Sequence, residues 1–255
     1  MAMALNPMEQ FEVKPLIARP LLTIGGHDIY FTNQALLMII VAVAASLFLT
    51  MAMSKRALVP GRGQSMAELS YEFVANMLHS AAGEDGLKFF PFVFTLFIFV
   101  LFSNFLGMIP GSFTVTSQIA VTFALASVVI LAVLITGFAT HGIGFLRLFV
   151  PSAPWYLLIL LIPIEIISFC TRPISLSVRL FANMLAGHTM LAVFGGFVVM
   201  LGGGALLLKP LALAPMALIV AIMLLELLVA FLQAYVFAIL TCIYLNEALH
   251  LHDHH

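Results

Sequence analysis

Apolar residues occur along this chain in long runs that contain no charged residue. Three such runs occupy residues 35–53, 89–109 and 118–140. A run of about 20 apolar residues is long enough to cross the hydrocarbon core of a membrane as an α-helix. The pattern therefore predicts a first transmembrane helix over 31–53 and a helical hairpin over 89–140 that crosses the membrane and returns.

Residues 64–88, between the first run and the hairpin, have a mixed pattern of charged and apolar positions. The apolar positions that share one face at helical spacing are Leu69, Phe73, Met77 and Leu78. A helix with one apolar and one charged face lies in the plane of the membrane surface. We therefore expect an amphipathic helix here. Residues 1–30 are expected to form a lead-in on the membrane surface.

The C-terminal part of the chain, 148–246, is almost entirely apolar but contains five charged residues and one histidine: Glu165, Arg172, Arg179, His188, Lys209 and Glu226. A Gly-rich turn at 202–204 divides it into two arms, which we place at 148–201 and 209–248. As helices these arms would be roughly 60–75 Å long, whereas the hydrocarbon core is about 30 Å thick. We expect them to be strongly tilted, near-horizontal or bent at a proline. Residues 31–255 are expected to form a single membrane domain.

The composition places most of the chain in lipid. Hydrophobic residues make up 63% of it and charged residues only 8%, against about a quarter charged in soluble domains. We therefore expect an all-α integral membrane protein with about five to six helices, two of them the long C-terminal ones. The net charge of −1 does not suggest a nucleic-acid partner. Cys170 and Cys242 are interpreted as packing residues.

The basic residues predict how the chain is oriented in the membrane. The cluster Lys55, Arg56 and Arg62 follows the first apolar run. Arg147 follows the hairpin. Loops rich in Lys and Arg stay on the cytoplasmic or matrix side. The N-terminus is therefore expected on the opposite side from these loops, and the C-terminus on the same side as them.

Charged and polar side chains form one stripe along the first long arm. Glu165, Arg172 and Arg179 are seven residues apart, a spacing that returns to nearly the same helix face. Ser175 and Asn183 lie on or beside this stripe. A charge at mid-membrane usually marks an ion path or a paired contact. Glu165 and Arg172 fit both interpretations, because side chains two turns apart can nearly meet as a structural ion pair.

Arg179 differs from the other two because no acidic residue lies within two turns of it. A guanidinium cannot avoid the cost of burial by losing its proton. Arg179 therefore needs a carboxylate from elsewhere, which we expect another chain to supply. This makes Arg179 the principal candidate for a functional residue.

His188 and Glu226 lie on different arms, at positions that face each other if the arms pack antiparallel. Gln233 follows Glu226 by seven residues, near the same face. Histidine and glutamate both exchange protons or hold water near neutral pH. Because each lies in an apolar segment, we interpret the pair as part of a proton path rather than as packing residues.

Several sequence motifs of enzymes are absent. The chain has no Gly-rich phosphate loop, no His-Glu-x-x-His and no plausible Ser-His-Asp set. We therefore expect a chain that is not an enzyme by itself and that holds no cofactor. The terminal residues 250–255 include four histidines. We interpret them as a solvated tail rather than a metal site.

Residues 175–188 read SLSVRLFANMLAGH, with an arginine, an asparagine four residues later and an ionisable residue nine residues later. This pattern resembles the a-subunit family of the F-type ATP synthase membrane sector. The resemblance extends to TRPISLS before Arg179, to AFLQAYVFAILTCIYL around Gln233 and to NFLGMIP at 104–110.

The resemblance implies the stator subunit of a rotary proton channel. Arg179 is then expected to face the ion-binding carboxylate of a rotating c-ring, between two offset half-channels. The residues implied to line the inlet half-channel, on the periplasmic side, are Glu165, His188, Glu226 and Gln233. Asn183 and Ser175 are implied to lie near Arg179, at the junction with the outlet. The implied partners are the c-ring subunits, b-type subunits of the peripheral stalk and the rest of the F1Fo complex.

One departure from many bacterial members is that they carry an acid at the position of His188 and a histidine at that of Glu226. Here the two are exchanged, as in mitochondrial forms, and the exchange keeps one acid and one imidazole. The resemblance implies a bacterial inner membrane, with the mitochondrial inner membrane as the alternative. The rival function is a self-contained secondary transporter or channel, for which matched internal repeats are expected. We find no such repeat in the sequence.

Overall fold

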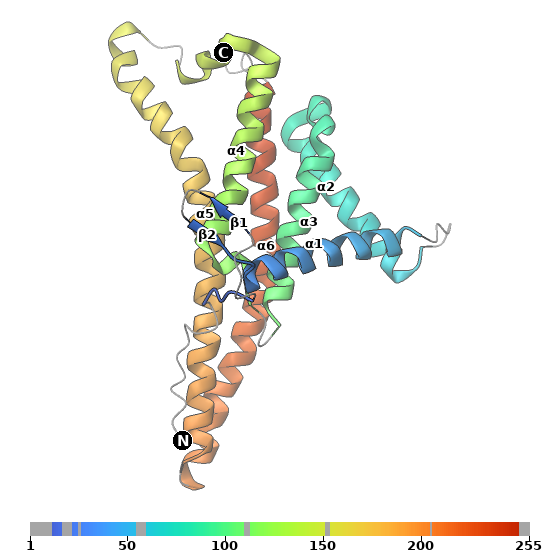
Figure 1. Ribbon diagram of the computed structural model, residues 1–255, viewed down its shortest axis with the longest axis vertical. Helices are drawn as coiled ribbons and strands as arrows, with labels where there is room; N and C mark the ends of the chain where they lie inside the picture. Colours follow the sequence, from blue (N-terminus) through green and yellow to red (C-terminus); the bar gives the residue numbers. More distant parts are fainter. Residues whose placement is uncertain are drawn as a thin grey trace. The chain divides into compact units, whose positions relative to one another are not determined.

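The computed structural model describes residues 12–16, 22–24, 27–54, 60–109, 113–150, 154–204 and 206–249. Within these residues, five helices are long and apolar enough to cross a membrane (Figure 1). The all-α membrane fold expected from the composition is thereby confirmed. The cluster Lys55 and Arg56 and the histidine-rich tail lie outside the described residues.

The first helix, α1 (Asn33–Ala52), contains no charged residue. Its 20 residues rise about 30 Å, which matches the hydrocarbon core. Thr32 caps its first turn, because its hydroxyl oxygen accepts a hydrogen bond from the backbone N–H of Ala35 at 3.3 Å. Asn33 holds the preceding chain, since its Oδ1 accepts a hydrogen bond from the backbone N–H of Lys14 at 3.2 Å. Helix α1 covers the segment expected at 31–53.

A short β-hairpin precedes α1. Strand β1 (Leu22–Ile24) pairs antiparallel with β2 (His27–Ile29), and Leu22 lies opposite Ile29. From the sequence we expect only a lead-in on the membrane surface for this part of the chain. The strand pair is therefore a feature that the sequence pattern did not predict.

Helix α2 (Arg62–Gly86) corresponds to the amphipathic segment. Its geometry is interrupted at Gly83, whose φ of 64° is one that glycine adopts most readily. The predicted apolar face is only partly correct, because Leu69 is 64% exposed. The residues that α2 buries are Ala67, Val74, Met77, Leu78, Ala82 and Gly86. The buried face of α2 thus includes the small residues Ala67 and Ala82, which are not part of the predicted apolar face. Small residues let neighbouring helices approach closely.

Helix α3 (Phe90–Gly107) follows the short 3-10 turn η2 (Leu87–Phe89). Helix α4 (Ile119–His141) follows the turn η3 (Val115–Ser117). These two helices correspond to the apolar runs 89–109 and 118–140, from which the helical hairpin at 89–140 is predicted. After α4, Gly142 has a φ of 56° and begins the 3-10 helix η4 (Gly142–Phe149). There the ring of Phe145 lies where a Cβ on Gly137 would be, so a larger residue at position 137 would have to displace this ring.

The two C-terminal helices are the longest elements. Helix α5 (Trp155–Gly202) has 48 residues and continues through Pro163 and Pro173, so the arm is not broken at either proline. After the turn η5 (Leu206–Ala212), α6 (Leu213–Leu249) has 37 residues. Their lengths are about 72 Å and 56 Å at 1.5 Å per residue. Both far exceed a hydrocarbon core of about 30 Å, which supports the predicted tilt.

The chain folds into two compact units that interleave along the sequence. The first unit contains the described residues of Met1–Ser46, Phe99–Gln118 and Leu180–Gln233. The second contains those of Leu47–Ile98, Ile119–Arg179 and Ala234–His255.

Candidate functional site

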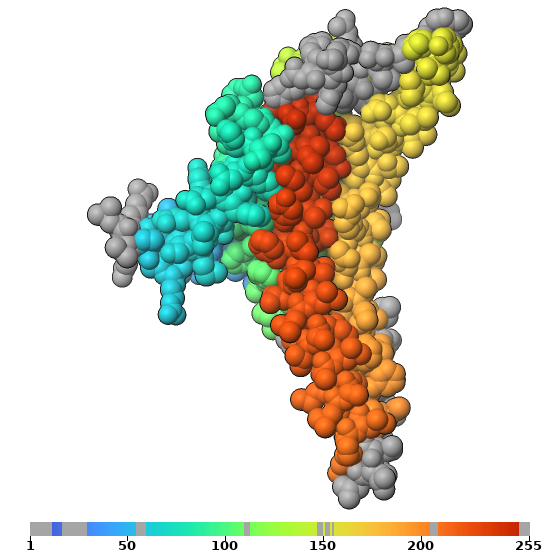
Figure 2. Space-filling model, turned by 180° about the vertical axis from the view of Figure 1, so that it is seen from behind, coloured from blue at the N-terminus to red at the C-terminus, as the bar shows by residue number. Residues whose placement is uncertain are grey.

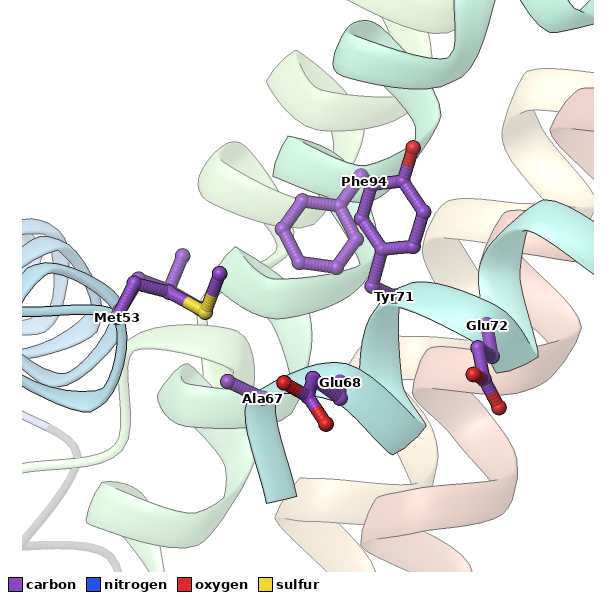
Figure 3. A pocket seen from close by; sticks show the side chains of 7 residues that line it. Met53, Ala67, Glu68, Tyr71, Glu72 and Phe94 are labelled. Carbon is purple, nitrogen blue, oxygen red and sulfur yellow. The ribbon is translucent and has the colours of Figure 1, made fainter. Parts of the chain in front are cut away.

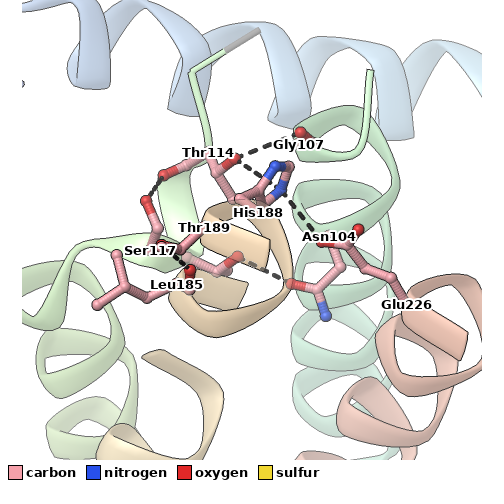
Figure 4. A network of polar contacts seen from close by, with 9 residues as sticks. Asn104, Gly107, Thr114, Ser117, Leu185, His188, Thr189 and Glu226 are labelled. Atoms are coloured by element: carbon pink, nitrogen blue, oxygen red, sulfur yellow. Dashed lines mark hydrogen bonds and ion pairs between the residues drawn. The ribbon is translucent and has the colours of Figure 1, made fainter. Parts of the chain in front are cut away.

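The first unit buries several polar side chains among apolar helices. They come from α3, the segment before α4, α5 and α6 (Figure 4). Its buried polar residues are Ser103, Asn104, Thr114, Thr116, Ser117, Glu226 and Gln233. Burying a polar group without a hydrogen-bond partner is costly, and polar residues inside a membrane mark functional sites. This cluster is therefore the first place to look for an ion path.

At the centre of the cluster, His188 of α5 faces Glu226 of α6. The His188 Nε2 atom lies 3.5 Å from Glu226 Oε1, and the two side chains are 11% and 4% exposed. This separation allows charge pairing but is too long and oblique for a good hydrogen bond. Neither carboxylate oxygen of Glu226 has a hydrogen-bond partner among the described residues. The structure thus brings together the two residues that the sequence analysis places opposite each other.

Thr114, in the segment before α4, makes a close polar contact to this histidine. Its Oγ1 lies 3.1 Å from His188 Nε2 and donates to the carbonyl oxygen of Gly107 at 3.3 Å (Figure 4). Thr114 is not among the site residues that we predict from the sequence. The signal that points to it is the polar run TVTSQ at 114–118, which interrupts two apolar runs.

Asn104 of α3 ties the same segment to α6. Its amide nitrogen donates to the carbonyl oxygen of Ala230 at 3.1 Å, and its Oδ1 accepts from the hydroxyl of Thr116 at 2.9 Å. Ser117 closes the turn, since its hydroxyl donates to the carbonyl oxygen of Thr114 at 2.6 Å. These bonds hold Thr114 in place beside His188.

A second polar pair links α5 and α6. The amide of Asn183 donates to Oε1 of Gln233 at 2.9 Å, while Nε2 of the buried Gln233 has no partner among the described residues. Asn183 precedes His188 by five residues, and Gln233 follows Glu226 by seven. The partner of Asn183, which precedes His188 on α5, is Gln233, which follows Glu226 on α6. The two helices therefore run antiparallel here. The two pairs therefore form successive levels of one polar ladder.

Arg179 and Ser175 lie earlier on α5, in the second unit, and both are exposed. Spacings of four residues place Ser175, Arg179 and Asn183 on one face of α5. Arg179 makes no hydrogen bond or ion pair with another described residue. An exposed arginine on a helix of this hydropathy is available to a carboxylate from outside the chain.

Arg172 is paired, but with a different residue from the one considered in the sequence analysis. Its guanidinium forms an ion pair with Glu247 of α6 and lies 5.0 Å from the centre of the Tyr244 ring. The suggested structural pair of Arg172 with Glu165 is therefore wrong. Two helical turns separate those two along α5, whereas Glu247 approaches Arg172 from the neighbouring helix. Glu165 makes no ion pair with a described residue.

A separate pocket of about 370 Å³ lies in the second unit, between α1, α2 and α3 (Figure 3). Its lining comprises Leu49, Met53, Ala67, Glu68, Tyr71, Glu72 and Phe94. Glu68 accepts a hydrogen bond from the amide of Gln64 at 2.7 Å. None of the predicted site residues lines this pocket.

Comparison with known sequences identifies the family. Residues 35–246 match the family profile described as ATP synthase A chain. The chain belongs to this family. Among the family's proteins named ATP synthase subunit a, that of Mesorhizobium japonicum is 57% identical over 246 residues, 96% of each chain. That of Allorhizobium ampelinum is 58% identical over 249 residues, 97% of this chain and 98% of the relative. That of Hyphomonas neptunium is 55% identical over 254 residues, 99% of each chain.

Membership in the ATP synthase A chain family confirms the resemblance that was drawn from residues 175–188. It does not favour the rival interpretation of a self-contained transporter. The apolar surface of the protein fits a family that works in a membrane. Figure 2 shows one face along which α6 lies open, and its exposed leucines in the first unit include Leu224, Leu225, Leu227 and Leu228.

Proposed function

We propose that this chain is the static subunit of an ATP synthase proton channel, in which it couples proton movement across the membrane to rotation of a ring of c subunits. The observation that carries the proposal is the environment of Arg179. Arg179 is exposed and makes no ion pair with a described residue, and it lies on α5, the helix that also carries His188, whose ring faces the buried Glu226 of α6. In this role the chain binds no nucleotide and holds no cofactor, and it acts as one component of the F1Fo complex.

The inlet half-channel is proposed to run along the polar ladder. Glu226 and His188 exchange protons, and the amides of Asn183 and Gln233 carry hydrogen bonds one level further toward Arg179. The described residues of α5 and α6 around this ladder are mostly apolar, so the ladder offers a polar route for water and protons. A proton that leaves the ladder is expected to neutralise a carboxylate on the ring, which can then turn into lipid without carrying a charge.

Arg179 is proposed to separate the inlet from the outlet. A fixed positive charge beside a carboxylate favours its ionised form. A ring carboxylate that reaches Arg179 therefore releases its proton to the outlet. The same charge repels protons that would otherwise pass directly from one half-channel to the other. Lysine cannot replace it, because an ammonium lacks the planar fork and can lose its proton.

Glu165 is proposed for the outlet side rather than the inlet. It precedes Arg179 by 14 residues and His188 by 23 on one continuous helix. These spacings correspond to about 21 Å and 35 Å of helical rise. A residue on the other side of Arg179 from His188 cannot line the same half-channel if Arg179 divides the two. Ser175, between Glu165 and Arg179, is proposed for the junction with the outlet.

The proposed location is the inner membrane of a bacterium, with b-type stalk subunits as further partners. An odd number of membrane crossings places the two ends of a chain on opposite sides. The described residues contain five candidate spans, of which Arg62–Gly107 combines α2 and α3. Five crossings agree with an N-terminus in the periplasm and a C-terminus in the cytoplasm. In this topology the segment at 113–117 lies toward the periplasm, where an inlet is needed.

The decisive experiment replaces Arg179 in the assembled complex. Arg179→Ala is expected to abolish ATP-driven acidification of inverted membrane vesicles, and Arg179→Lys should fail as well. Lys209→Ala, which removes an exposed cation from η5, is the matched control and should pump normally. Pumping that survives Arg179→Ala in fully assembled complexes would rule out the mechanism.

A second experiment tests the partner directly. Ala182 is exposed beside Arg179 on α5, so a cysteine placed there should cross-link to a cysteine on the outward face of a ring subunit. Both native cysteines, Cys170 and Cys242, are first replaced by serine or alanine to remove the background. A cysteine at the buried position Ala234 should give no product. Selective ion conduction by the purified chain alone in liposomes would instead support the rival transporter.

A further inference from the structure

The hydroxyl of Thr114 has one proton and two close polar neighbours in the first unit. One neighbour, the carbonyl oxygen of Gly107 at 3.3 Å, only accepts hydrogen bonds. The proton of Thr114 is therefore directed to Gly107. Position 107 allows this approach because it is a glycine, since a Cβ there would lie 2.8 Å from Cγ2 of Thr114.

The other neighbour is Nε2 of His188, at 3.1 Å. With the proton of Thr114 assigned to the bond with Gly107, Thr114 acts as the acceptor toward His188, and Nε2 of the imidazole supplies the hydrogen. We therefore assign the proton of the neutral ring to Nε2, and the charged ring carries a proton there as well. This is also the nitrogen that lies 3.5 Å from Glu226 Oε1.

The buried carboxylate of Glu226 makes the position of the proton on His188 important. Its two carboxylate oxygens are buried and have no hydrogen-bond partner among the described residues. Nε2 of His188 lies 3.5 Å from Oε1 of Glu226 and 3.1 Å from Oγ1 of Thr114, so its N–H group is placed beside both. Moving the proton to Nδ1 would place an acceptor nitrogen against the carboxylate, and turning the ring would replace Nε2 there by a carbon, so either change would interrupt the exchange.

The position of Thr114 is itself held by several bonds. Thr116, two residues on, donates to Asn104, and Asn104 donates to the carbonyl oxygen of Ala230. Ala230 lies one turn after Glu226 on α6. The segment that orients His188 is therefore tied to the helix that carries its partner. His188 and Glu226 are the titratable groups of this cluster within the described residues.

We propose that Thr114 is a positioning residue that orients His188 so that a proton on Nε2 faces Glu226. The proposal rests on the function proposed for the inlet half-channel and names the group that controls proton transfer within it. Thr114 takes no proton from the ion path itself. It acts through His188, by the hydrogen bond that it accepts.

The test compares Thr114→Val, which keeps the shape but removes the hydroxyl, with Thr114→Ser, which keeps the hydroxyl. ATP-driven pumping is measured in inverted vesicles from pH 6 to 9 and normalised to assembled complex. Thr114→Val should lower the rate about tenfold, the effect of one hydrogen bond on a transfer step, and should change the pH profile. Thr114→Ser should stay within about twofold of the natural protein. The matched control, Thr189→Val, removes a hydroxyl that bonds only within α5, to Leu185.

The outcomes separate this inference from the proposed function. Normal pumping by Thr114→Val, or an equal loss in Thr114→Ser, overturns the inference. A purely structural role would lower the amount of assembled complex without changing the pH profile. In a His188→Gln background, Thr114→Val should cause no further loss, and an additional tenfold loss there would contradict action through His188. If His188→Gln alone pumps normally, the inlet proposed above is wrong instead.

Discussion

Gly187 leaves the space in which the Glu226 carboxylate lies. A Cβ at this position would come within 2.7 Å of Glu226 Oε1 and 3.0 Å of its Cδ. The first contact is shorter than real Cβ atoms show, so a side chain at position 187 would push the flexible end of Glu226 aside. Gly187 therefore belongs to the proposed proton site, although it carries no chemistry itself.

Replacing Gly187 by alanine should displace the Glu226 side chain from His188. We expect ATP-driven pumping to fall at least about tenfold, because proton transfer depends steeply on the distance between donor and acceptor. Gly195→Ala is the matched control on the same helix, since nothing lies within 4 Å of a Cβ there. It should pump normally and be slightly more stable, because alanine favours a helix over glycine by about 1 kcal/mol. Equal activity of the two variants would contradict this packing argument.

The pair Asn183 and Gln233 predicts an asymmetry in stability. Asn183→Ala leaves the buried Gln233 without its hydrogen-bond donor, which costs about 1–3 kcal/mol. Gln233→Leu removes the buried polar group altogether and leaves Asn183, which is exposed, to water. The first variant should therefore lower the melting temperature of the detergent-solubilised complex more than the second. Pumping should fall in both, and the reverse order of melting temperatures would argue against the pair.

The long helices were predictable from sequence because lipid imposes a simple rule on length and hydropathy. Uncharged runs of about 20 residues at 35–53, 89–109 and 118–140 correspond to α1, α3 and α4. The β-hairpin was missed because its strands have three residues each. The Gly-Gly pair between them, Gly25 and Gly26, is a hairpin signal that a search for membrane helices passes over.

The contacts within the site were predictable only in part. His188 and Glu226 were paired correctly because each is an isolated polar residue on an apolar helix, and antiparallel arms bring them to the same level. Arg172 was assigned the wrong partner because spacing along one helix says nothing about the neighbouring helix, which carries Glu247. Thr114 was missed because the polar run TVTSQ at 114–118 marks the segment but not which of its hydroxyls faces α5. Its role depends on a fold that brings the segment before α4 against α5.

The ion pair between Arg172 and Glu247 should contribute to stability rather than to proton transfer. Arg172→Gln removes the pair and the contact of the guanidinium with the Tyr244 ring, at an expected cost of about 1–2 kcal/mol. Glu165→Gln, which breaks no ion pair with a described residue, should leave the melting temperature unchanged. Thermal unfolding of the purified complex measures both. A larger loss of stability in Glu165→Gln than in Arg172→Gln would restore the pair suggested by spacing alone.

The exchange of acid and imidazole between positions 188 and 226 predicts the result of a double substitution. His188→Glu alone places two carboxyl groups at the 3.5 Å contact, and Glu226→His alone places two imidazoles there. Each single change removes one kind of proton carrier and should lower pumping at least tenfold, since like charges at this distance cannot both be present in an apolar site. The double variant, His188→Glu with Glu226→His, restores one acid and one imidazole in reversed order. Its pumping rate should return to within several-fold of the natural rate, because Gly187 still leaves space beside position 226. If the double variant is as inactive as the single ones, the two residues act separately and not as one proton-exchanging pair.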